Sequence, residues 1–244
     1  MRLLSPSKLS FITAIKYRIL NWVRKVLSIW YRQSYSQLGE DIAIRHILQN
    51  DFNLNNGVYL DVGCNHPIIY SNTFELYLNN WTGIVIDINS ELISLHKRER
   101  KKDIQINKAV SDSNEKVLVY KFDSHLINSI NKEFYEQFKN KNQLVSEPKT
   151  VMTETLNQIL KENNISSVDL LCIDVEGHDF KVLKSIDLWK YRPKLIVIEM
   201  HDFSFETLYK NEIYSYLKEH KYRFAGYLIA NGYFTDETHQ ILGN

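Results

Sequence analysis

The chain has 244 residues, of which 44% are apolar and 24% are charged, with eight glycines and four prolines. This length accommodates one α/β domain with a short extension and excludes two domains of ordinary size. The apolar content excludes a disordered chain, because it is sufficient for a packed core. Cys64 and Cys172 lie in or beside apolar segments, which argues against a disulfide framework and favours a reducing, cytoplasmic setting.

The net charge of +1 hides an uneven distribution along the chain. Residues 1–32 hold seven of the 30 basic residues and none of the 29 acidic ones. The remainder is therefore acidic, which argues against a nucleic-acid partner. We expect residues 1–34 to form a basic segment apart from one domain that comprises residues 35–244.

The basic segment has apolar residues at three- and four-residue steps between residues 8 and 32, which predicts an amphipathic helix. Basic side chains interrupt each apolar run before it could span a bilayer, and no signal-peptide cleavage site follows. Trp22, Trp30 and Tyr31 accompany these charges, so one interpretation is a helix lying on the anionic inner surface of a membrane. The alternative is a helix that packs on the domain or on another subunit.

The rest of the chain alternates strand-like and helical patterns, which predicts a mostly parallel, doubly wound α/β sheet. The expected strands are residues 57–62, 83–87, 104–110, 116–122, 168–174 and 194–199. The expected helices are residues 37–49, 71–78, 90–100, 153–162, 178–185 and 205–219. Residues 222–234 contain Asn231-Gly232, a dipeptide favoured in tight turns, which predicts a C-terminal antiparallel hairpin. Residues 123–149 are polar and irregular apart from a helix expected near residues 132–138, and a substrate-specific insertion could lie there.

Two of the expected strands end in an acidic residue. Asp61 ends the first strand before a turn at Gly63, which lets a ligand approach the backbone closely. Asp87 ends the second strand, where a carboxylate can accept hydrogen bonds from both ribose hydroxyls of an adenosine cofactor. The turn lacks the Gly-x-Gly-x-x-Gly that seats a pyrophosphate, so NAD and FAD fit poorly. S-adenosylmethionine carries no phosphate, and Asp61 can interact near its cationic methionine end.

Further segments follow in a fixed order around these two acids. They are residues 36–41, 71–73, 81–87, 107–111, 173–178 and 193–199, of which 174–178 read Asp-Val-Glu-Gly-His. Together they resemble the FkbM family of S-adenosylmethionine-dependent methyltransferases over residues 35–227. The family more often has Ala, Asn and a second Gly after the glycine of the first turn. Cys64 and Pro67 depart from that pattern.

The resemblance implies a Rossmann-like class I methyltransferase fold and methyl transfer from S-adenosylmethionine to a hydroxyl oxygen. It implies that the first turn surrounds the methionine part, that Asp87 holds the ribose and that residues 108–110 border the adenine. It also implies that residues 36–41 fold over the cofactor as a lid, although acids here also suit the first turn of a helix. The expected cofactor-binding residues are Gln37, Glu40, Asp61, Gly63, Cys64, Asn65, Asp87, Lys108, Ala109, Val110 and Asp174.

Methyl transfer requires a group that removes or shares the hydroxyl proton. The candidates are Asp174, Glu176, His178 and His201, with His178 and Glu176 ranked first because they lie in the matched motif. Each also has a structural interpretation, as a helix cap, as a partner of a nearby lysine or as a loop histidine. The same side chains would permit Mg²⁺, but no ligand set of defined spacing is visible, so the sequence predicts no metal.

The leading hypothesis is an O-methyltransferase that acts on a carbohydrate or glycolipid precursor in the cytoplasm. A second hypothesis is a methyltransferase for a small-molecule or polyketide hydroxyl. A third, of another class, is a binding protein that retains the fold without catalysis. The intact acids at Asp61, Asp87 and Asp174 favour an enzyme over this third hypothesis.

Overall fold

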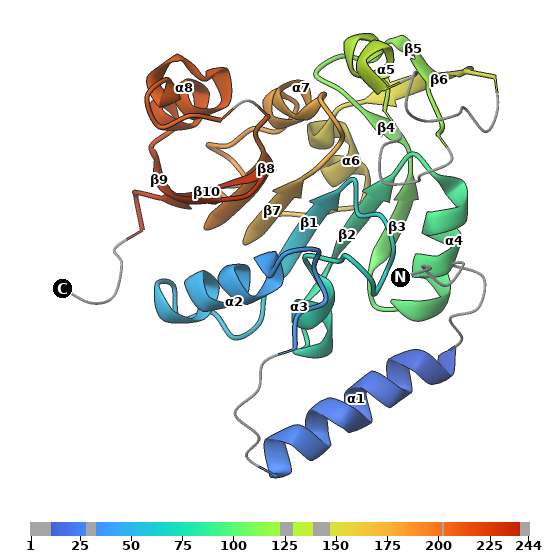
Figure 1. The fold of residues 1–244 in the computed structure, drawn as a ribbon, viewed down its shortest axis with the longest axis vertical. Helices are drawn as coiled ribbons and strands as arrows, with labels where there is room; N and C mark the ends of the chain where they lie inside the picture. Colours follow the sequence, from blue (N-terminus) through green and yellow to red (C-terminus); the bar gives the residue numbers. More distant parts are fainter. Residues whose placement is uncertain (1–10, 28–32, 123–128, 139–146, 202, 240–244) are drawn as a thin grey trace.

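The core of the fold is a seven-stranded sheet with helices on both faces, as Figure 1 shows for the computed structural model. The structure describes residues 11–27, 33–122, 129–138, 147–201 and 203–239. The strand order is β3-β2-β1-β7-β8-β10-β9. The strands are β1 (Val58–Val62), β2 (Thr82–Asp87), β3 (Ile104–Asn107), β7 (Leu170–Ile173), β8 (Leu195–Glu199), β9 (Tyr222–Leu228) and β10 (Asn231–Asp236). β1, β2, β3, β7 and β8 pair in parallel and β10 is antiparallel to both of its neighbours, which confirms the predicted sheet.

Alternate residues of the central strands face two helical layers. The helices are α2 (Glu40–Asn50), α3 (Phe74–Leu78), α4 (Ser90–Glu99), α6 (Leu156–Glu162), α7 (Asp179–Lys184) and α8 (Glu212–Glu219). In β7, Leu171 and Ile173 belong to the apolar cluster of α6, α7 and α8, whereas Leu170 and Cys172 belong to that of α2, α3 and α4. Strands buried on both faces read as continuous apolar runs, which is why the sequence pattern located them.

A second, three-stranded sheet lies beside the carboxyl ends of β1 to β3, together with α5 (Lys132–Phe138), as Figure 1 shows. Its order is β4-β6-β5, with β4 (Ala109–Val110), β5 (Lys116–Val119) and β6 (Lys149–Glu154). The prediction of one strand over residues 104–110 was wrong, because the chain leaves the main sheet at Lys108 and β4 pairs with β6. The helix expected at 153–162 begins later, where the Thr155 hydroxyl accepts a hydrogen bond from the Gln158 amide. The helix expected near 132–138 is confirmed as α5.

Two predictions near the C-terminus were also wrong in part. Residues 205–219 form a short 3-10 helix (Leu208–Lys210) and then α8, which starts where the Asn211 side chain accepts a hydrogen bond from the Tyr214 amide. The hairpin turns at Ile229 and Ala230, and Asn231-Gly232 instead opens β10. Packing explains Gly232, because a Cβ atom there would lie 2.4 Å from the Met200 sulfur.

The expected N-terminal helix is confirmed for residues Phe11–Val26 (α1), and its predicted ends, with Trp30 and Tyr31, lie outside the described residues. It lies at the end of the molecule away from the second sheet and contacts α4, as Figure 1 shows. The Arg18 guanidinium stands 5.7 Å from the centre of the Tyr77 ring. Among the described residues, no helix combines the length and hydropathy that crossing a bilayer requires.

Candidate functional site

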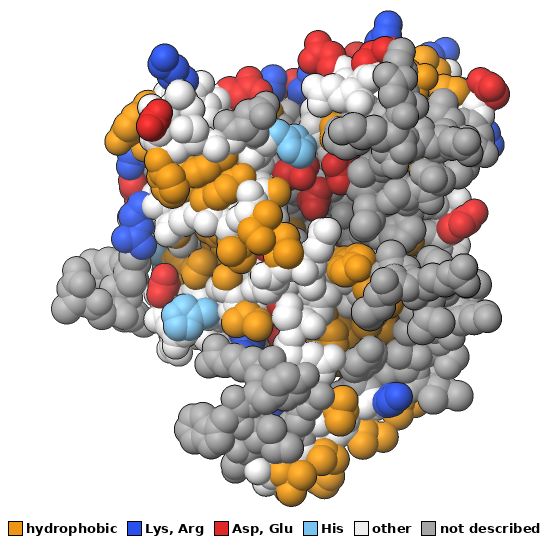
Figure 2. All heavy atoms as spheres, viewed as in Figure 1, with side chains coloured by type: hydrophobic (Ala, Val, Ile, Leu, Met, Phe, Trp, Pro, Cys, Tyr) orange, Lys and Arg blue, Asp and Glu red, His pale blue; other side chains and the backbone are white. Residues whose placement is uncertain are grey.

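A cavity of about 450 Å³ lies at the carboxyl ends of β1, β2, β7 and β8. Open α/β sheets bind ligands at this edge, and the volume falls in the usual range for small-molecule sites. The walls come from the turn after β1, the end of β2, the start of the second sheet and the loop after β7. Figure 2 shows acidic side chains grouped beside a histidine near the middle of the same face.

The turn after β1 is locked between the two neighbouring strands. The amides of Gly63 and Cys64 both donate to the Ile86 carbonyl, at 2.9 and 3.2 Å. Gly63 has a φ of 79°, and a Cβ atom there would lie 1.7 Å from the Asp174 carbonyl oxygen. Glycine is therefore required both for its conformation and for the close approach of β7. Cys64 is a buried free thiol that lines the cavity, so the departure from the family pattern at this position places a small apolar group in the wall.

Asp87 stands at the end of β2 with its carboxylate in the cavity wall. Its two oxygens accept hydrogen bonds from the amides of Asn89 and Asn65, at 2.7 and 3.0 Å. Burial raises its pKa to about 6; these two bonds and Lys121 oppose the rise, while Asp61 adds to it. The group is therefore ionised at neutral pH and can accept further hydrogen bonds. Beside it, Asn65 Oδ1 is buried and has no hydrogen-bond partner within the described part of the chain.

Asp61 is held by a buried polar network that the sequence did not indicate. Its carboxylate accepts a 2.5 Å hydrogen bond from the Thr73 hydroxyl. The fully buried Arg100 donates to the same hydroxyl at 3.0 Å, to the Tyr59 hydroxyl at 2.7 Å and to the Asp103 carboxylate at 2.7 Å. Burial raises the pKa of Asp61, and Thr73 and Arg100 oppose this shift. This network holds the Asp61 carboxylate in place at the cavity wall.

The loop after β7 has an unusual backbone that several side chains hold in place. Glu176 and Gly177 both have positive φ, at 56° and 83°. The Asp179 carboxylate accepts the amides of Val175 and Gly177, at 2.9 and 3.0 Å. The Ser129 hydroxyl donates to the Glu176 carbonyl at 2.8 Å, and the Asn131 side chain donates to the Gly177 carbonyl. Because non-glycine residues rarely hold this conformation, these bonds determine where Glu176 points.

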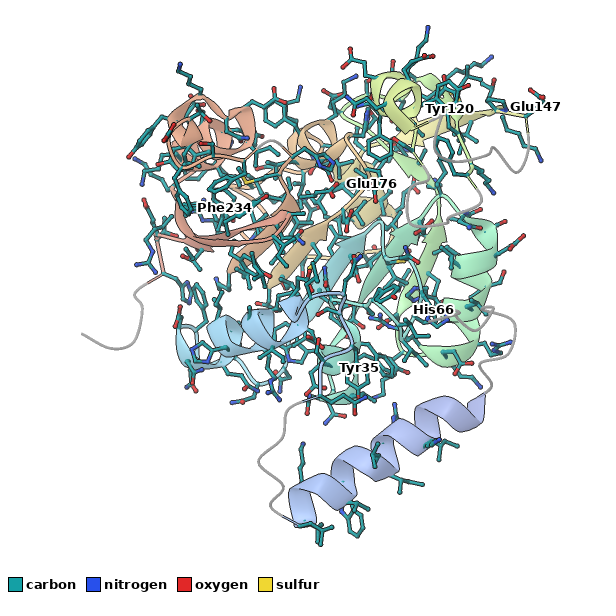
Figure 3. All side chains as sticks on the ribbon, in the orientation of Figure 1. Tyr35, His66, Tyr120, Glu147, Glu176 and Phe234 are labelled. Carbon is teal, nitrogen blue, oxygen red and sulfur yellow. The ribbon has the colours of Figure 1, made fainter. Side chains whose placement is uncertain are left out.

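Glu176 lies at the carboxyl edge of the sheet near α7, as labelled in Figure 3. Burial and the nearby Glu199 and Asp179 carboxylates raise its pKa to about 8. Burial and the same neighbours raise the pKa of Asp174 well above its usual range. The Nε2 of His201 lies 3.0 Å from the Glu199 carboxylate, which raises the pKa of the imidazole to about 9. These carboxyl groups and His201 therefore retain protons at neutral pH, because burial and mutual repulsion oppose ionisation of all the acids together.

His178 differs from this cluster in its protonation. Its Nε2 lies 3.0 Å from the Ser111 hydroxyl, and burial together with Lys181 lowers its pKa to about 4. The imidazole is therefore neutral at physiological pH and forms part of the cavity wall.

A family model for the methyltransferase FkbM domain matches residues 61–224. The chain belongs to the FkbM methyltransferase family. Searches of curated proteins and of solved structures found no match. The topology described above is the Rossmann-like methyltransferase fold that the sequence resemblance implied. The match begins at Asp61 and ends in β9, so it includes the turn after β1, Asp87 and the whole acidic loop.

This FkbM methyltransferase brings most of the sequence-predicted residues to one cavity. The predicted residues that line it are Gln37, Asp61, Gly63, Cys64, Asn65, Asp87, Lys108, Ala109, Val110, Asp174, Glu176 and His178. Lys108 forms an ion pair with Glu154. Glu40 is not a wall residue, because it is buried at the start of α2 and its carboxylate accepts a hydrogen bond from the Leu38 amide at 2.8 Å. His201 stands just outside the wall and reaches the cavity through Glu199.

The structure assigns to other residues the structural roles considered above for Asp174 and Glu176, as a helix cap and as a partner of a nearby lysine. Asp179 rather than Asp174 binds the amides before α7. Lys184 pairs with Asp112 at 2.8 Å and not with Glu176.

Sequence reasoning missed several wall residues, of which Glu199 is the most consequential. It ends β8 as Asp87 ends β2, and Asp61 is the last residue but one of β1, so the same strand-end argument could have found it. Tyr70 and Asn72 reach the wall from the segment after the first turn, and the hairpin turn brings Ile229 and Ala230 to it. Asn72 belongs to the 71–73 segment of the family resemblance, which could have indicated it. The other three positions carry no local signal, because each depends on the tertiary path of a loop.

Proposed function

We propose that the protein is an S-adenosylmethionine-dependent O-methyltransferase acting on a hydroxyl of a carbohydrate or glycolipid precursor. The observation that carries the cofactor assignment is the ionised Asp87 carboxylate, held by two backbone amides at the cavity wall. It offers the acceptor that a ribose requires. The buried Asn65 Oδ1 offers a second acceptor without a donor in the described chain, as a cofactor amine or hydroxyl would satisfy.

The wall also suits the charge of this cofactor. Asp61 lies beside the Gly63 turn, where its carboxylate would attract the cationic methionine end, and Asp174 offers a further carboxyl group on the other side of the turn. Ile88 and Ala109 supply apolar surface for the adenine. When bound, S-adenosylmethionine supplies a methyl group whose bond to sulfur breaks with the electrons remaining on sulfur, while the acceptor oxygen bonds to it and releases its proton.

The residues of this chain would align the acceptor and take that proton. Glu176, with a pKa near 8, is in the range that a general base at neutral pH requires. Glu199, Asn72 and Tyr70 offer polar groups that can bind a hydroxyl-rich acceptor, which favours a sugar. The exposed Leu38 and Ile229 beside them would also accommodate a polyketide, which remains the second candidate.

Calorimetric titration with S-adenosylmethionine and S-adenosylhomocysteine tests the cofactor assignment. We expect binding by the wild type and a loss on the order of 10- to 100-fold in Asp87→Ala, the worth of one charged hydrogen bond. Glu91→Gln removes an exposed carboxylate from the first turn of α4 and serves as a control that binds normally. No binding by the wild type would exclude the proposal. Release of S-adenosylhomocysteine in the presence of candidate sugars, followed by mass spectrometry of the product, separates an enzyme from a binding protein.

We also propose that α1 lies on an anionic membrane and brings the enzyme to a lipid-linked acceptor. Ile15, Ile19, Trp22 and Val26 recur along one face of the helix and are all exposed, with the exposed Lys16 and Lys25 beside this face. Apolar side chains enter the headgroup region, and each basic group adds about 1 kcal/mol near an anionic surface. In a flotation assay, the wild-type protein should float with phosphatidylserine vesicles. The double variant Ile19→Ser, Trp22→Ser should not. Equal flotation of the wild type and the double variant would contradict the membrane proposal, and vesicles of neutral lipid provide the control.

A further inference from the structure

Three side chains of the acidic cluster converge on one point. Glu176 comes from the loop after β7, Glu199 from the end of β8 and His201 from two residues further on. Their ligand atoms, two carboxylate oxygens and an imidazole nitrogen, all lie within 4.8 Å of one another. This spacing matches three donors around a single ion, since ligand bonds of about 2.0–2.3 Å place neighbouring donors roughly 3–4.5 Å apart.

Glu199 provides an independent indication that a cation belongs there. Its side chain is only 10% exposed, and its Oε2 is buried. Apart from the ion pair with His201 Nε2 at 3.0 Å, Oε2 has no hydrogen-bond partner in the described residues. A buried carboxylate that lacks donors is costly unless a positive charge compensates it.

The balance of charge in the cluster points the same way. Asp174, Glu176 and Glu199 all line the cavity. Lys108 is the one lysine or arginine among the described wall residues, and it already pairs with Glu154. Asp179 adds a further carboxylate but is committed to two backbone amides. The described protein therefore supplies His201 as the one positive partner near Glu176 and Glu199.

The ligand positions are also rigid enough to select an ion. The Glu176 backbone is held in its positive-φ conformation by Asp179, by Ser129 and through Gly177 by Asn131. Glu199 belongs to a central strand of the sheet. His201 is 46% exposed, so the position is accessible from the cavity mouth. Ligands fixed by such contacts bind metals without reorganisation.

We propose that Glu176, Glu199 and His201 bind a divalent first-row transition ion such as Mn²⁺. Two carboxylates favour a hard ion, and the imidazole favours Mn²⁺, Fe²⁺ or Zn²⁺ over Mg²⁺ and Ca²⁺. Three protein ligands leave coordination positions open, as in catalytic rather than structural sites.

If the proposed methyltransferase function holds, these open positions bind the acceptor. In this arrangement Glu176 would serve as a metal ligand instead of as the general base. A hydroxyl oxygen coordinated to the ion would have a lowered pKa and would release its proton to water before it attacks the methyl group. Acceptors that present a second oxygen next to this hydroxyl, such as the vicinal diol of a sugar, would chelate the ion. The ion would therefore select sugars over isolated hydroxyls.

The test measures binding of Mn²⁺ alone to the full chain after treatment with a chelator. Titration followed by electron paramagnetic resonance should show one bound Mn²⁺ per chain. We expect His201→Ala and Glu199→Gln each to weaken binding by at least about tenfold. Glu237→Gln removes a distant carboxylate that pairs with Lys218 and should bind as the wild type does. Circular dichroism verifies folding, and the exposed His201 keeps the test valid if the Glu199 variant unfolds.

The outcomes separate this proposal from the proposed function. Absence of stoichiometric Mn²⁺ binding by the wild type, or unchanged binding in a folded His201→Ala, would overturn the metal site. S-adenosylmethionine is titrated separately into metal-free protein. Its failure to bind would reject the cofactor assignment while leaving a positive Mn²⁺ result intact.

Discussion

Replacing Gly63 by alanine should destabilise the protein more than any other glycine substitution in a cavity wall or surface turn. The added Cβ would lie 1.7 Å from the Asp174 carbonyl oxygen, which is backbone and cannot rotate away. The positive φ of 79° costs an alanine about 1–2 kcal/mol. Forcing β1 and β7 apart adds about 1–3 kcal/mol or more. We therefore expect a loss of roughly 2–5 kcal/mol, or about 4–20 °C in the melting temperature.

Two other glycines separate the contributions to this loss. Gly39 has a φ of 100°, and no atom lies within 4 Å of the position that an added methyl group would occupy. Gly39→Ala should therefore lose only the conformational contribution of about 1–2 kcal/mol. Gly226 lies in β9 with open space around it, and Gly226→Ala should change stability by less than about 1 kcal/mol.

Urea denaturation followed by circular dichroism ranks the three variants. Gly63→Ala should have the lowest midpoint and Gly226→Ala a midpoint near that of the wild type. If Gly63→Ala is no less stable than Gly39→Ala, the turn after β1 does not pack on β7 as described, and the cavity wall built on it is wrong.

Three further predictions concern the site. Arg100→Met should cost about 3–5 kcal/mol in urea denaturation, because it leaves a buried carboxylate without its counter-charge, whereas the exposed Lys97→Met should be near neutral. The affinity for S-adenosylmethionine should fall as the pH drops below about 6, because Asp87 then gains a proton and one of its oxygens no longer accepts a hydrogen bond. Calorimetry between pH 5 and 8 should show this pH dependence in the wild type and not in Asp87→Asn. The same group opposes folding above about pH 6, so its protonation stabilises the ligand-free protein as the pH falls from about 6 to about 4. AMP should compete with S-adenosylmethionine at least about tenfold less well than adenosine, and equal competition would contradict an acidic site.

The sequence predicted the sheet and the strand-end acids because both depend on local order. Asp61 and Asp87 lie at the carboxyl ends of neighbouring parallel strands, and parallel topology necessarily brings those ends to one edge. The Arg100 network could not be predicted, since Tyr59, Thr73 and Asp103 reach the arginine from separate segments. A buried arginine has no sequence signature that distinguishes it from an exposed one.

The Asn231-Gly232 prediction failed for a related reason. The dipeptide suits a tight turn, but Gly232 lies in β10 beside the Met200 side chain, which would have to shift to admit a Cβ atom. The turn falls instead on Ile229, a β-branched residue with a φ of 57°. Such a conformation is disfavoured for isoleucine, so its presence at the cavity wall depends on the surrounding strands and could not be inferred from local preference.

The charge of the cavity connects the fold to the choice of ligand. Asp61, Asp87 and Asp174 arrive at the wall because three parallel strands end there, and Glu199 arrives because β8 is the next strand. The one lysine among the described wall residues is neutralised by Glu154. A phosphate would face several carboxylates without a free cation, whereas a sulfonium, an amine or a metal ion would relieve their repulsion. The single glycine of the first turn and the negative charge of the cavity wall therefore indicate the same ligand class. Both disfavour a dinucleotide, and both suit a cationic cofactor.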